Sequence, residues 1–120
     1  MKKEVENWWK HAQKDLEKAE VLYDSKHFDG AAFFCQQGVE KGLKALLIKT
    51  TASFPRTHDL TMLARLTKAP DNIITLCARI NPAYTAARYP DSPQEYTKED
   101  CKKLLADSMV VLKWIEEELG

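Results

Sequence analysis

The sequence predicts an all-α protein, an antiparallel up-and-down four-helix bundle with an additional short helix, on three observations. Apolar residues recur at three- and four-residue steps through most of the chain, which is the spacing of one helix face. No segment shows the period-two alternation that a half-buried strand would need. The breaks between the periodic segments are short, so consecutive helices should run antiparallel. At this length, residues 1–120 are expected to form a single helical domain.

Two long helices are predicted in the first half of the chain, over about residues 3 to 25 and about residues 28 to 51. Ser25-Lys26-His27 marks the break between them, which is so short that the two helices should form an antiparallel hairpin. The first apolar stripe consists of Val5, Trp8, Trp9, Ala12, Leu16, Ala19, Leu22 and Tyr23. The second consists of Phe28, Ala31, Ala32, Cys35, Val39, Leu43, Leu46 and Leu47.

Two shorter helices are predicted after a loop at residues 51–56. Thr57 offers the hydroxyl of an N-cap for a short helix that carries three leucines at helical spacing. Asp71 is expected to cap a fourth helix. The Asn81-Pro82 pair should bend or end that helix, because proline disfavours the α conformation in the preceding residue and lacks a backbone N–H.

The last helix has two alternative starting points. Thr97 followed by Asp100 approximates a capping box. Ser92-Pro93-Gln94-Glu95 offers a competing start a few residues earlier, and the sequence leaves both open. The periodic residues that follow are Leu104, Leu105, Ser108, Leu112, Ile115 and Leu119.

The charge and hydropathy of the chain argue against a nonspecific nucleic-acid binder and against a membrane protein. Its 18 basic and 18 acidic residues leave no net charge, so the general attraction on which nonspecific nucleic-acid binders depend is missing. Any contact with RNA or a nucleotide must therefore be local. The sequence contains no run of about 18 apolar residues, which a membrane-spanning helix would need. The N-terminal segment also lacks the apolar stretch of a signal peptide. We expect a cytoplasmic protein that does not act at a membrane.

The sequence predicts no metal site and no cofactor. Cys35, Cys77 and Cys101 lie too far apart for a C-x-x-C pair, and their odd number argues against a disulfide framework. We expect them to be packed thiols in a reducing compartment. No predicted helix carries two His or carboxylate ligands in a cluster with a third.

The second helix carries charge on the side opposite its main apolar stripe. At 100° per residue this side holds Gln37, Glu40, Lys41 and Lys44. Two phenylalanines and an isoleucine share the same side, so the helix is apolar nearly all round. Such a helix is usually buried, and its charges must then be paired or face a ligand. Glu40 and Lys44, four residues apart with the acid first, could pair. A solvated surface pair and a lined groove or dimer seam are the two interpretations.

Three blocks of the sequence occur in the order and spacing of a known family. They are Ala31, Ala32, Phe34, Gln36, Gln37, Glu40, Lys41, Leu43, Lys44, Ala45 and Leu46, then Thr57-His58-Asp59-Leu60, then Arg88-Tyr89-Pro90-Asp91. The chain thereby resembles the HEPN domains, named for their occurrence in higher eukaryotes and prokaryotes and for nucleotide binding. Over nearly the whole chain, the resemblance implies an antiparallel four-helix bundle, frequently a homodimer. It also implies a minimal nucleotidyltransferase as partner, in a toxin–antitoxin-type pair.

Active members of this family cut RNA without a metal, using an Arg followed four to six residues later by a His. The guanidinium stabilises charge on the phosphate, and the imidazole moves the proton. This chain has Arg88, but no histidine lies in residues 89–96, and His11, His27 and His58 all precede the arginine. The resemblance therefore carries over only at Arg88, and we assign no catalytic residue.

The loop Arg88-Tyr89-Pro90-Asp91 is stiffened by proline and could present Arg88 and Tyr89 to an anionic ligand. Arg88 has a second interpretation as a structural tie to helix C-terminal carbonyls or to Glu40. Tyr89 is expected to cover the core with its ring, with stacking on a base as the alternative. Asp91 is typical of a turn.

Two further residues are candidates for a chemical role. In some toxin members a tyrosine just after the catalytic histidine is adenylylated by the nucleotidyltransferase, and Tyr96 lies in the corresponding neighbourhood. Tyr96 is therefore a candidate for modification. His58 is placed in the first turn of a helix, where a local hydrogen bond near the cap is expected in preference to catalysis.

Three functional hypotheses follow. The preferred one is a binding module that holds a nucleotidyltransferase partner, a nucleotide or RNA, without RNase activity, through Arg88, Tyr89, Asp91, Glu40, Lys44 and Gln37. The second is a metal-independent RNase whose proton carrier is rearranged, for example Tyr89 or a histidine from a second subunit. It requires an imidazole near Arg88 in the assembled protein. The third is a structural helical scaffold in which the polar stripe only fixes packing.

Overall fold

The computed structural model describes residues 2–91 and 95–120. Six helices and no strand make up this part of the chain. They are α1 (Lys3–Asp24), α2 (Phe28–Thr51), α3 (Leu60–Leu66), α4 (Asp71–Ile80), α5 (Ala83–Ala86) and α6 (Lys98–Leu119). The predicted all-α class is confirmed, and both long helices of the first half end within one residue of their predicted bounds.

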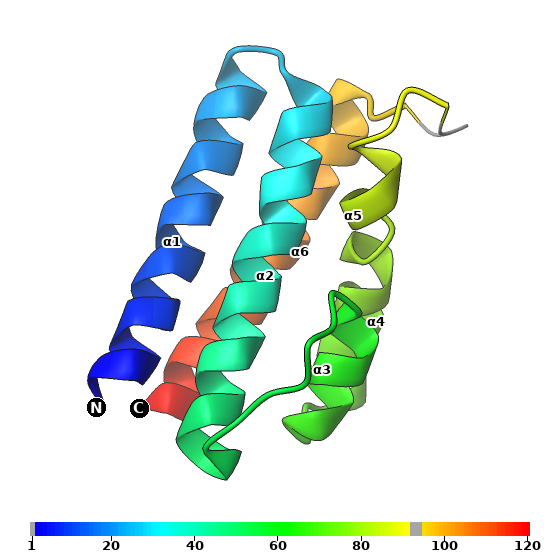
Figure 1. Cartoon of the computed structure of the whole chain (residues 1–120). Helices are drawn as coiled ribbons and strands as arrows, with labels where there is room; N and C mark the ends of the chain where they lie inside the picture. The colour runs from blue at the N-terminus through cyan, green and yellow to red at the C-terminus, as the bar shows by residue number, and fades with distance from the viewer. Residues whose placement is uncertain (1, 92–94) are drawn as a thin grey trace.

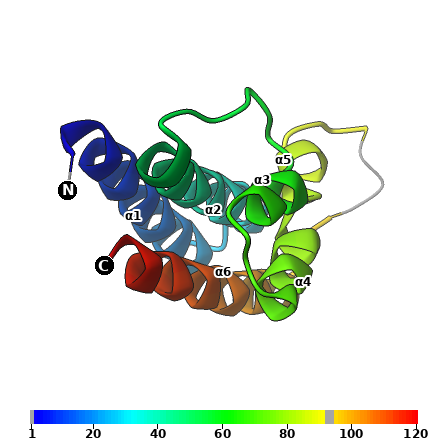
Figure 2. The ribbon, with the colours of Figure 1, turned by 90° about the horizontal axis from the view of Figure 1, so that it is seen from below.

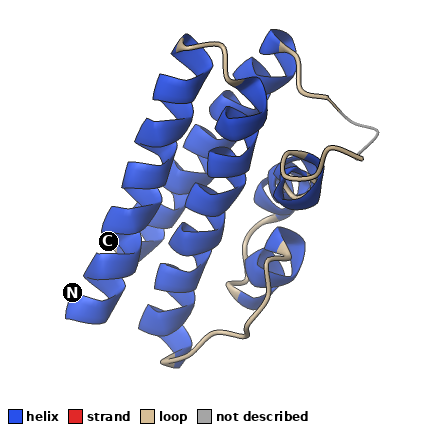
Figure 3. Ribbon diagram, turned by 45° about the horizontal axis from the view of Figure 1, so that its top comes forward, coloured by secondary structure: helices blue, strands red, loops and turns tan. Residues whose placement is uncertain are grey.

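The helices form an up-and-down bundle with one broken column. α1, α2 and α6 are long rods, while α3, α4 and α5 follow one another as the third column before α6 returns (Figure 1). Both ends of the chain lie at the same end of the bundle, as the view from below also shows (Figure 2). The connections, drawn as tan loops in Figure 3, join the helices at their ends. Short connections therefore impose antiparallel packing, as the sequence predicted.

α2 is the central helix and contacts each of the other five. Fourteen of its 24 residues are buried. Two glycines let its neighbours approach closely: a Cβ on Gly38 would lie 3.1 Å from the carbonyl oxygen of Ala12 in α1, and one on Gly42 would lie 2.9 Å from Leu112 of α6. A polar side chain on the buried faces of α2 must therefore find its partners inside the protein.

Two predicted N-caps are wrong by one or two residues. Asp59, not Thr57, caps α3, and its side chain accepts from the backbone N–H groups of Thr61 and Met62. The Thr57 hydroxyl instead accepts from the backbone N–H of Asp59, which forms a turn ahead of the helix. α4 is capped by Pro70, whose carbonyl accepts from Ile74, so that Asp71 becomes the first helical residue.

The segment after α4 contains a turn of helix that the sequence did not predict. Asn81-Pro82 ends α4 as expected, but α5 begins at once at Ala83, since a proline just ahead of a helix has the φ that a first turn needs. At α6, Thr97 and Asp100 form a complete capping box, which confirms that start. The competing start at residues 92–95 lies largely outside the described residues, and α6 begins at Lys98.

Asp59→Ala should lower the free energy of unfolding by about 1 kcal/mol at neutral pH, because the first turn of α3 loses its cap. Asp59→Asn keeps a capping oxygen and should cost less. Urea unfolding followed by circular dichroism measures both variants. Equal losses in the two would show that the cap oxygen does not stabilise α3.

Acid should remove part of the contribution of Asp59. The Thr61 hydroxyl, which donates to its carboxylate, holds the pKa of Asp59 below its ordinary value. Because that pKa is lowered in the folded state, the stabilisation is present at neutral pH and is lost as the pH falls below about 4. The Tm difference between wild type and Asp59→Asn should therefore shrink on acidification, and a constant difference would contradict this role.

Candidate functional site

The centre of the site is a buried polar row on α2. Gln36, Glu40 and Lys44 follow one another at four-residue steps and are 0%, 4% and 6% exposed. Lys44 Nζ donates to Glu40 Oε2 over 3.0 Å, and Gln36 Nε2 donates to Glu40 Oε1 over 3.2 Å. The predicted pairing of Glu40 with Lys44 is confirmed, but the interpretation as a solvated surface pair is wrong, since both side chains lie inside the protein.

Aromatic side chains from two other segments cover Lys44. Its ammonium lies 5.1 Å from the ring centroid of Phe54, in the α2–α3 loop, and 5.9 Å from that of Trp8 in α1. Trp8 and Phe54 also meet edge to face. The charge is therefore neutralised by Glu40 and flanked by rings, and a direct role for Lys44 in binding a ligand stays a prediction.

His58 joins this row from the loop ahead of α3. Its Nδ1 lies 2.8 Å from Glu40 Oε1, and its backbone carbonyl accepts from Gln36 Nε2 over 3.0 Å. The predicted local hydrogen bond near the cap is therefore wrong. His58 precedes α3 instead of lying in its first turn, so its ring turns back to α2. The side chain is nevertheless 53% exposed.

Tyr84 links His58 to Arg88. The rings of His58 and Tyr84 stack with their centroids 4.1 Å apart and their planes 18° apart. One helical turn further, Arg88 Cζ lies 4.8 Å from the centroid of the same tyrosine ring. The sum of these two distances sets an upper limit of about 9 Å on the separation of the imidazole centroid and the guanidinium carbon. His58, which belongs to a distant segment of the sequence, thus lies close to Arg88 in the structure.

Arg88 is exposed at the surface and rests on aromatic rings. Besides Tyr84, its guanidinium lies 5.7 Å from the ring centroid of Phe33 and 5.3 Å from that of Tyr89. No ion pair between Arg88 and a carboxylate exists among the described residues. In particular, the suggested tie to Glu40 is wrong, because Glu40 is taken up by Lys44, Gln36 and His58.

The surface is hollowed at both ends of this aromatic cluster. One hollow of about 340 Å³ is lined by His58, Asp59, Asn81, Pro82, Tyr84 and Thr85. Another of about 390 Å³ is lined by Asp29, Ala86, Ala87, Arg88, Tyr89, Pro90 and Glu95. Tyr89 is 49% exposed, so the prediction that its ring covers the core is wrong. A ligand on this surface would meet the guanidinium, two tyrosine rings and the imidazole.

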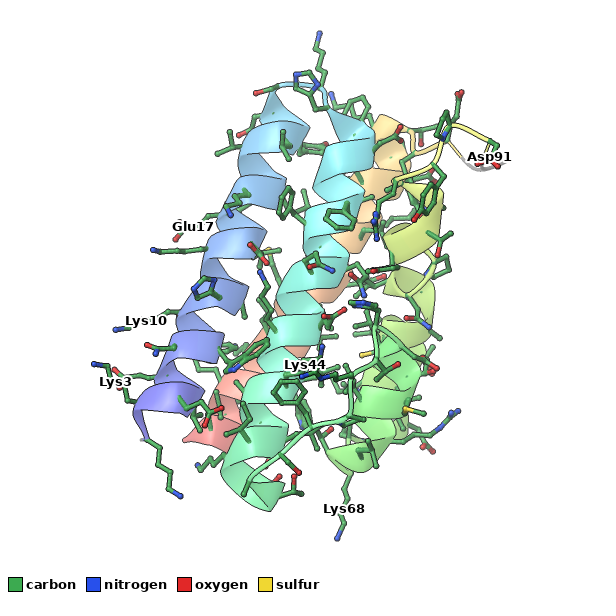
Figure 4. The ribbon with its side chains drawn as sticks, viewed as in Figure 1. Lys3, Lys10, Glu17, Lys44, Lys68 and Asp91 are labelled. Atoms are coloured by element: carbon green, nitrogen blue, oxygen red, sulfur yellow. The ribbon has the colours of Figure 1, made fainter. Side chains whose placement is uncertain are left out.

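The remaining predicted site residues are not gathered in one place. Gln37 donates to Gln36 Oε1 over 2.8 Å and so extends the buried row. Asp91 lies in the outer loop, well apart from Lys44 (Figure 4). Tyr96 is only 8% exposed, and burial raises the pKa of its hydroxyl to about 12. Modification of Tyr96 stays a prediction, and it would require an opening of the surface around the ring.

Sequence reasoning missed Tyr84 and misjudged His58. The spacing of Tyr84 and Arg88, four residues apart, was visible, but the proline-rich context favoured a loop over the turn of helix that makes this spacing meaningful. No local pattern could connect His58 to Glu40, which lies 18 residues earlier.

The three cysteines are buried free thiols, as predicted. Burial raises the pKa of Cys35 and Cys77 to about 12 and that of Cys101 to about 11, so none of them has the thiolate character of a reactive cysteine. Among the described residues no group of three His, Cys, Asp or Glu side chains could hold a metal ion. Nor does the described part of the chain contain a helix long and apolar enough to cross a membrane.

Comparison with known proteins agrees with the fold and with the family resemblance of the sequence. The HEPN domain model matches residues 5–119. This chain belongs to the HEPN domain family. It is 33% identical to "Putative toxin MJ1304" of Methanocaldococcus jannaschii, over 92% of this chain and 84% of that protein.

Two solved structures share the fold over almost the whole HEPN domain. ST0689, an archaeal HEPN homologue, superposes with a TM-score of 0.83 at 31% identity over the full length of both chains. TT1696 from Thermus thermophilus superposes with a TM-score of 0.86 at 21% identity, over 95% of this chain and 97% of that one. The HEPN resemblance predicted from the sequence is confirmed.

Lys44→Met should lower the free energy of unfolding by about 3 kcal/mol, because it leaves the Glu40 carboxylate buried without its cation. Adding Glu40→Gln to this variant removes the unpaired charge, so the double variant should be more stable than Lys44→Met alone. Urea unfolding of the single and double variants measures the coupling.

The matched control is the exposed pair Glu6–Lys10, also four residues apart, with 3.8 Å between its charged atoms. Glu6→Gln should change the free energy of unfolding by less than about 0.5 kcal/mol. Additive losses in the Glu40 and Lys44 variants would show that the buried pair is not coupled.

Proposed function

We propose that this HEPN protein is a toxin–antitoxin-type module that binds RNA or a nucleotide on the surface formed by Arg88, Tyr84, Tyr89 and His58. The observation that carries the proposal is the environment of Arg88. Its guanidinium is exposed, is held against three aromatic rings, and forms no ion pair with a carboxylate among the described residues.

The chemistry of this surface suits a nucleotide. A planar guanidinium with several N–H donors matches a phosphate group, and its contact with rings fixes its position without using those donors. Exposed tyrosine and histidine rings provide faces on which bases stack. Because the chain has no net charge, binding should depend on these few groups and not on a general positive field.

A relative supports the toxin–antitoxin role, and the family resemblance supports the partner. One protein that is 33% identical over most of both chains is named as a putative toxin, and HEPN resemblance supports a minimal nucleotidyltransferase as partner and a homodimeric, cytoplasmic protein. Within this proposal Glu40 acts from below the surface, because it contacts the ring of His58. Gln37 and Lys44 act through the side chains of Gln36 and Glu40, to which they donate. Asp91 contributes from the outer loop, next to Arg88 and Tyr89.

A second candidate, metal-independent RNA cleavage, is favoured by one specific observation. It requires an imidazole near Arg88, and His58 lies within about 9 Å of the guanidinium. A purely structural scaffold is the third candidate. It would leave Arg88 without a ligand, and the binding experiment below separates it from the other two.

Arg88→Ala should weaken the binding of single-stranded RNA about tenfold, as expected when one phosphate contact is lost. The helical circular dichroism and the Tm should stay nearly unchanged, because the side chain is exposed. Fluorescence anisotropy with a labelled RNA oligonucleotide, in excess chelator, measures the affinity.

Arg79→Ala is the matched control, since it removes the same charge from an exposed arginine that lies beside Asp107 on another face. Its affinity should stay within about twofold of wild type. A large loss of Tm in Arg88→Ala would identify Arg88 as a structural tie. A failure of the wild-type protein to bind RNA, a nucleotide or a nucleotidyltransferase would overturn the proposal.

A further inference from the structure

We propose that the hollow beside His58 is a base-binding subsite selective for guanine, and that the carboxylate of Asp59 determines this selectivity. The subsite depends on the proposed function, since RNA must also bind at Arg88. It goes beyond that function because it places a particular base in the second hollow of the surface. It also gives a role in recognition to a residue that caps α3.

The two oxygens of the Asp59 carboxylate have different surroundings. Oδ1 accepts from the backbone N–H of Thr61 at 3.0 Å, from the Thr61 hydroxyl at 2.7 Å, from the backbone N–H of Met62 at 3.4 Å and from the Asn81 amide at 3.0 Å. No donor of a described residue contacts Oδ2, and Asp59 is exposed. The carboxylate is therefore fixed through one oxygen and offers the other to a ligand.

The hollow that Asp59 lines has flat walls and a polar rim. Its volume is about 340 Å³, and its walls include the rings of His58, Tyr84 and Pro82. The first two rings stack on each other with centroids 4.1 Å apart, and the side chain of His58 is still 53% exposed. The Asn81 amide, on the same wall, carries two N–H groups and gives one to Asp59. Flat rings beside hydrogen-bonding groups are suited to a nucleobase.

Charge directs the base and the phosphate to different hollows. The Thr61 hydroxyl, which donates to the carboxylate, holds the pKa of Asp59 below its ordinary value. Asp59 is therefore ionised at neutral pH and repels a phosphate, which binds instead at the guanidinium of Arg88. The His58 ring centroid and the Arg88 guanidinium carbon are at most about 9 Å apart. One nucleotide, or two neighbours in a strand, can therefore occupy both places.

The hydrogen-bonding pattern of the hollow selects guanine among the four bases. An ionised carboxylate only accepts hydrogen bonds, and guanine presents two adjacent donors, its N1–H and its N2 amino group. Adenine and cytosine place the lone pair of a ring nitrogen beside their amino group, and uracil places its single N–H between two carbonyl oxygens. Those lone pairs would face the negative charge of Asp59. The guanine carbonyl O6, next to N1, can accept the second N–H of Asn81.

The test measures the affinity for three fluorescently labelled RNAs by anisotropy. Each is a short uridine-rich single strand that differs only at its central base, which is guanine, hypoxanthine or adenine. Wild type should bind the guanine RNA about tenfold more tightly than the adenine RNA, as expected for one base read by paired hydrogen bonds. Hypoxanthine lacks the N2 amino group, so its RNA should fall between the two.

Asp59→Asn should reduce this preference to within about twofold. The amide oxygen must take the place of Oδ1, which receives the internal donors. The amide nitrogen then replaces Oδ2 and turns an acceptor into a donor. The preference is a ratio of two affinities of the same folded protein, so a loss of stability in the variant does not imitate the effect.

Asp71→Asn is the matched control, since it removes the same charge from an exposed aspartate at the start of α4, and it should keep the wild-type preference. Arg88→Ala should weaken all three RNAs alike, because it removes a phosphate contact.

Equal binding of the three RNAs by wild type would overturn the guanine subsite and leave the proposed binding function standing. A preference that survives in Asp59→Asn would overturn the role of Asp59. Absence of RNA binding by wild type would overturn both the subsite and the RNA-binding function on which it depends.

Discussion

The buried carboxylate of Glu40 is the constraint on which the rest of the site depends. A charge inside the bundle is tolerated only where it is paired and hydrogen-bonded, and Glu40 gathers Lys44, Gln36 and His58 around its two oxygens. Gln36 also binds the backbone of His58. The loop ahead of α3 is thereby fastened to the middle of α2, and the imidazole is fixed in place as a consequence.

This fastening connects the core of the HEPN fold to its surface. α2 contacts all five other helices and most of its residues are buried. Its buried polar groups can therefore influence the surface only through the residues to which they are hydrogen-bonded. What they hold is His58, on which Tyr84 stacks, and Tyr84 in turn supports Arg88. This series of contacts, from a buried ion pair to an exposed guanidinium, therefore places an imidazole and a guanidinium on one face of the protein. The interactions that stabilise the buried polar row of α2 therefore also fix the positions of the side chains on this surface.

The sequence predicted those parts of the molecule whose cause is local. The bounds of α2, the pairing of Glu40 with Lys44, and the capping box at Thr97 all follow from spacings of three or four residues. The parts that the sequence did not predict depend on contacts between distant segments, or on a choice between two residues of similar chemistry. Asp59 and Thr57 both carry capping oxygens, and only the path of the loop decides between them. The contact of His58 with Glu40 depends on how α3 packs against α2, which no pattern within either segment encodes.

The central claim is that Arg88 and His58 form one RNA-binding surface. It is tested most directly by a nuclear magnetic resonance titration of the full chain, labelled at arginine Nε and histidine Cε1, with single-stranded RNA. The account predicts that the resonances of Arg88 and His58 shift together with the same apparent Kd, while those of His11 and His27 stay still. A shift of Arg88 without His58, or equal shifts of all three histidines, would contradict it.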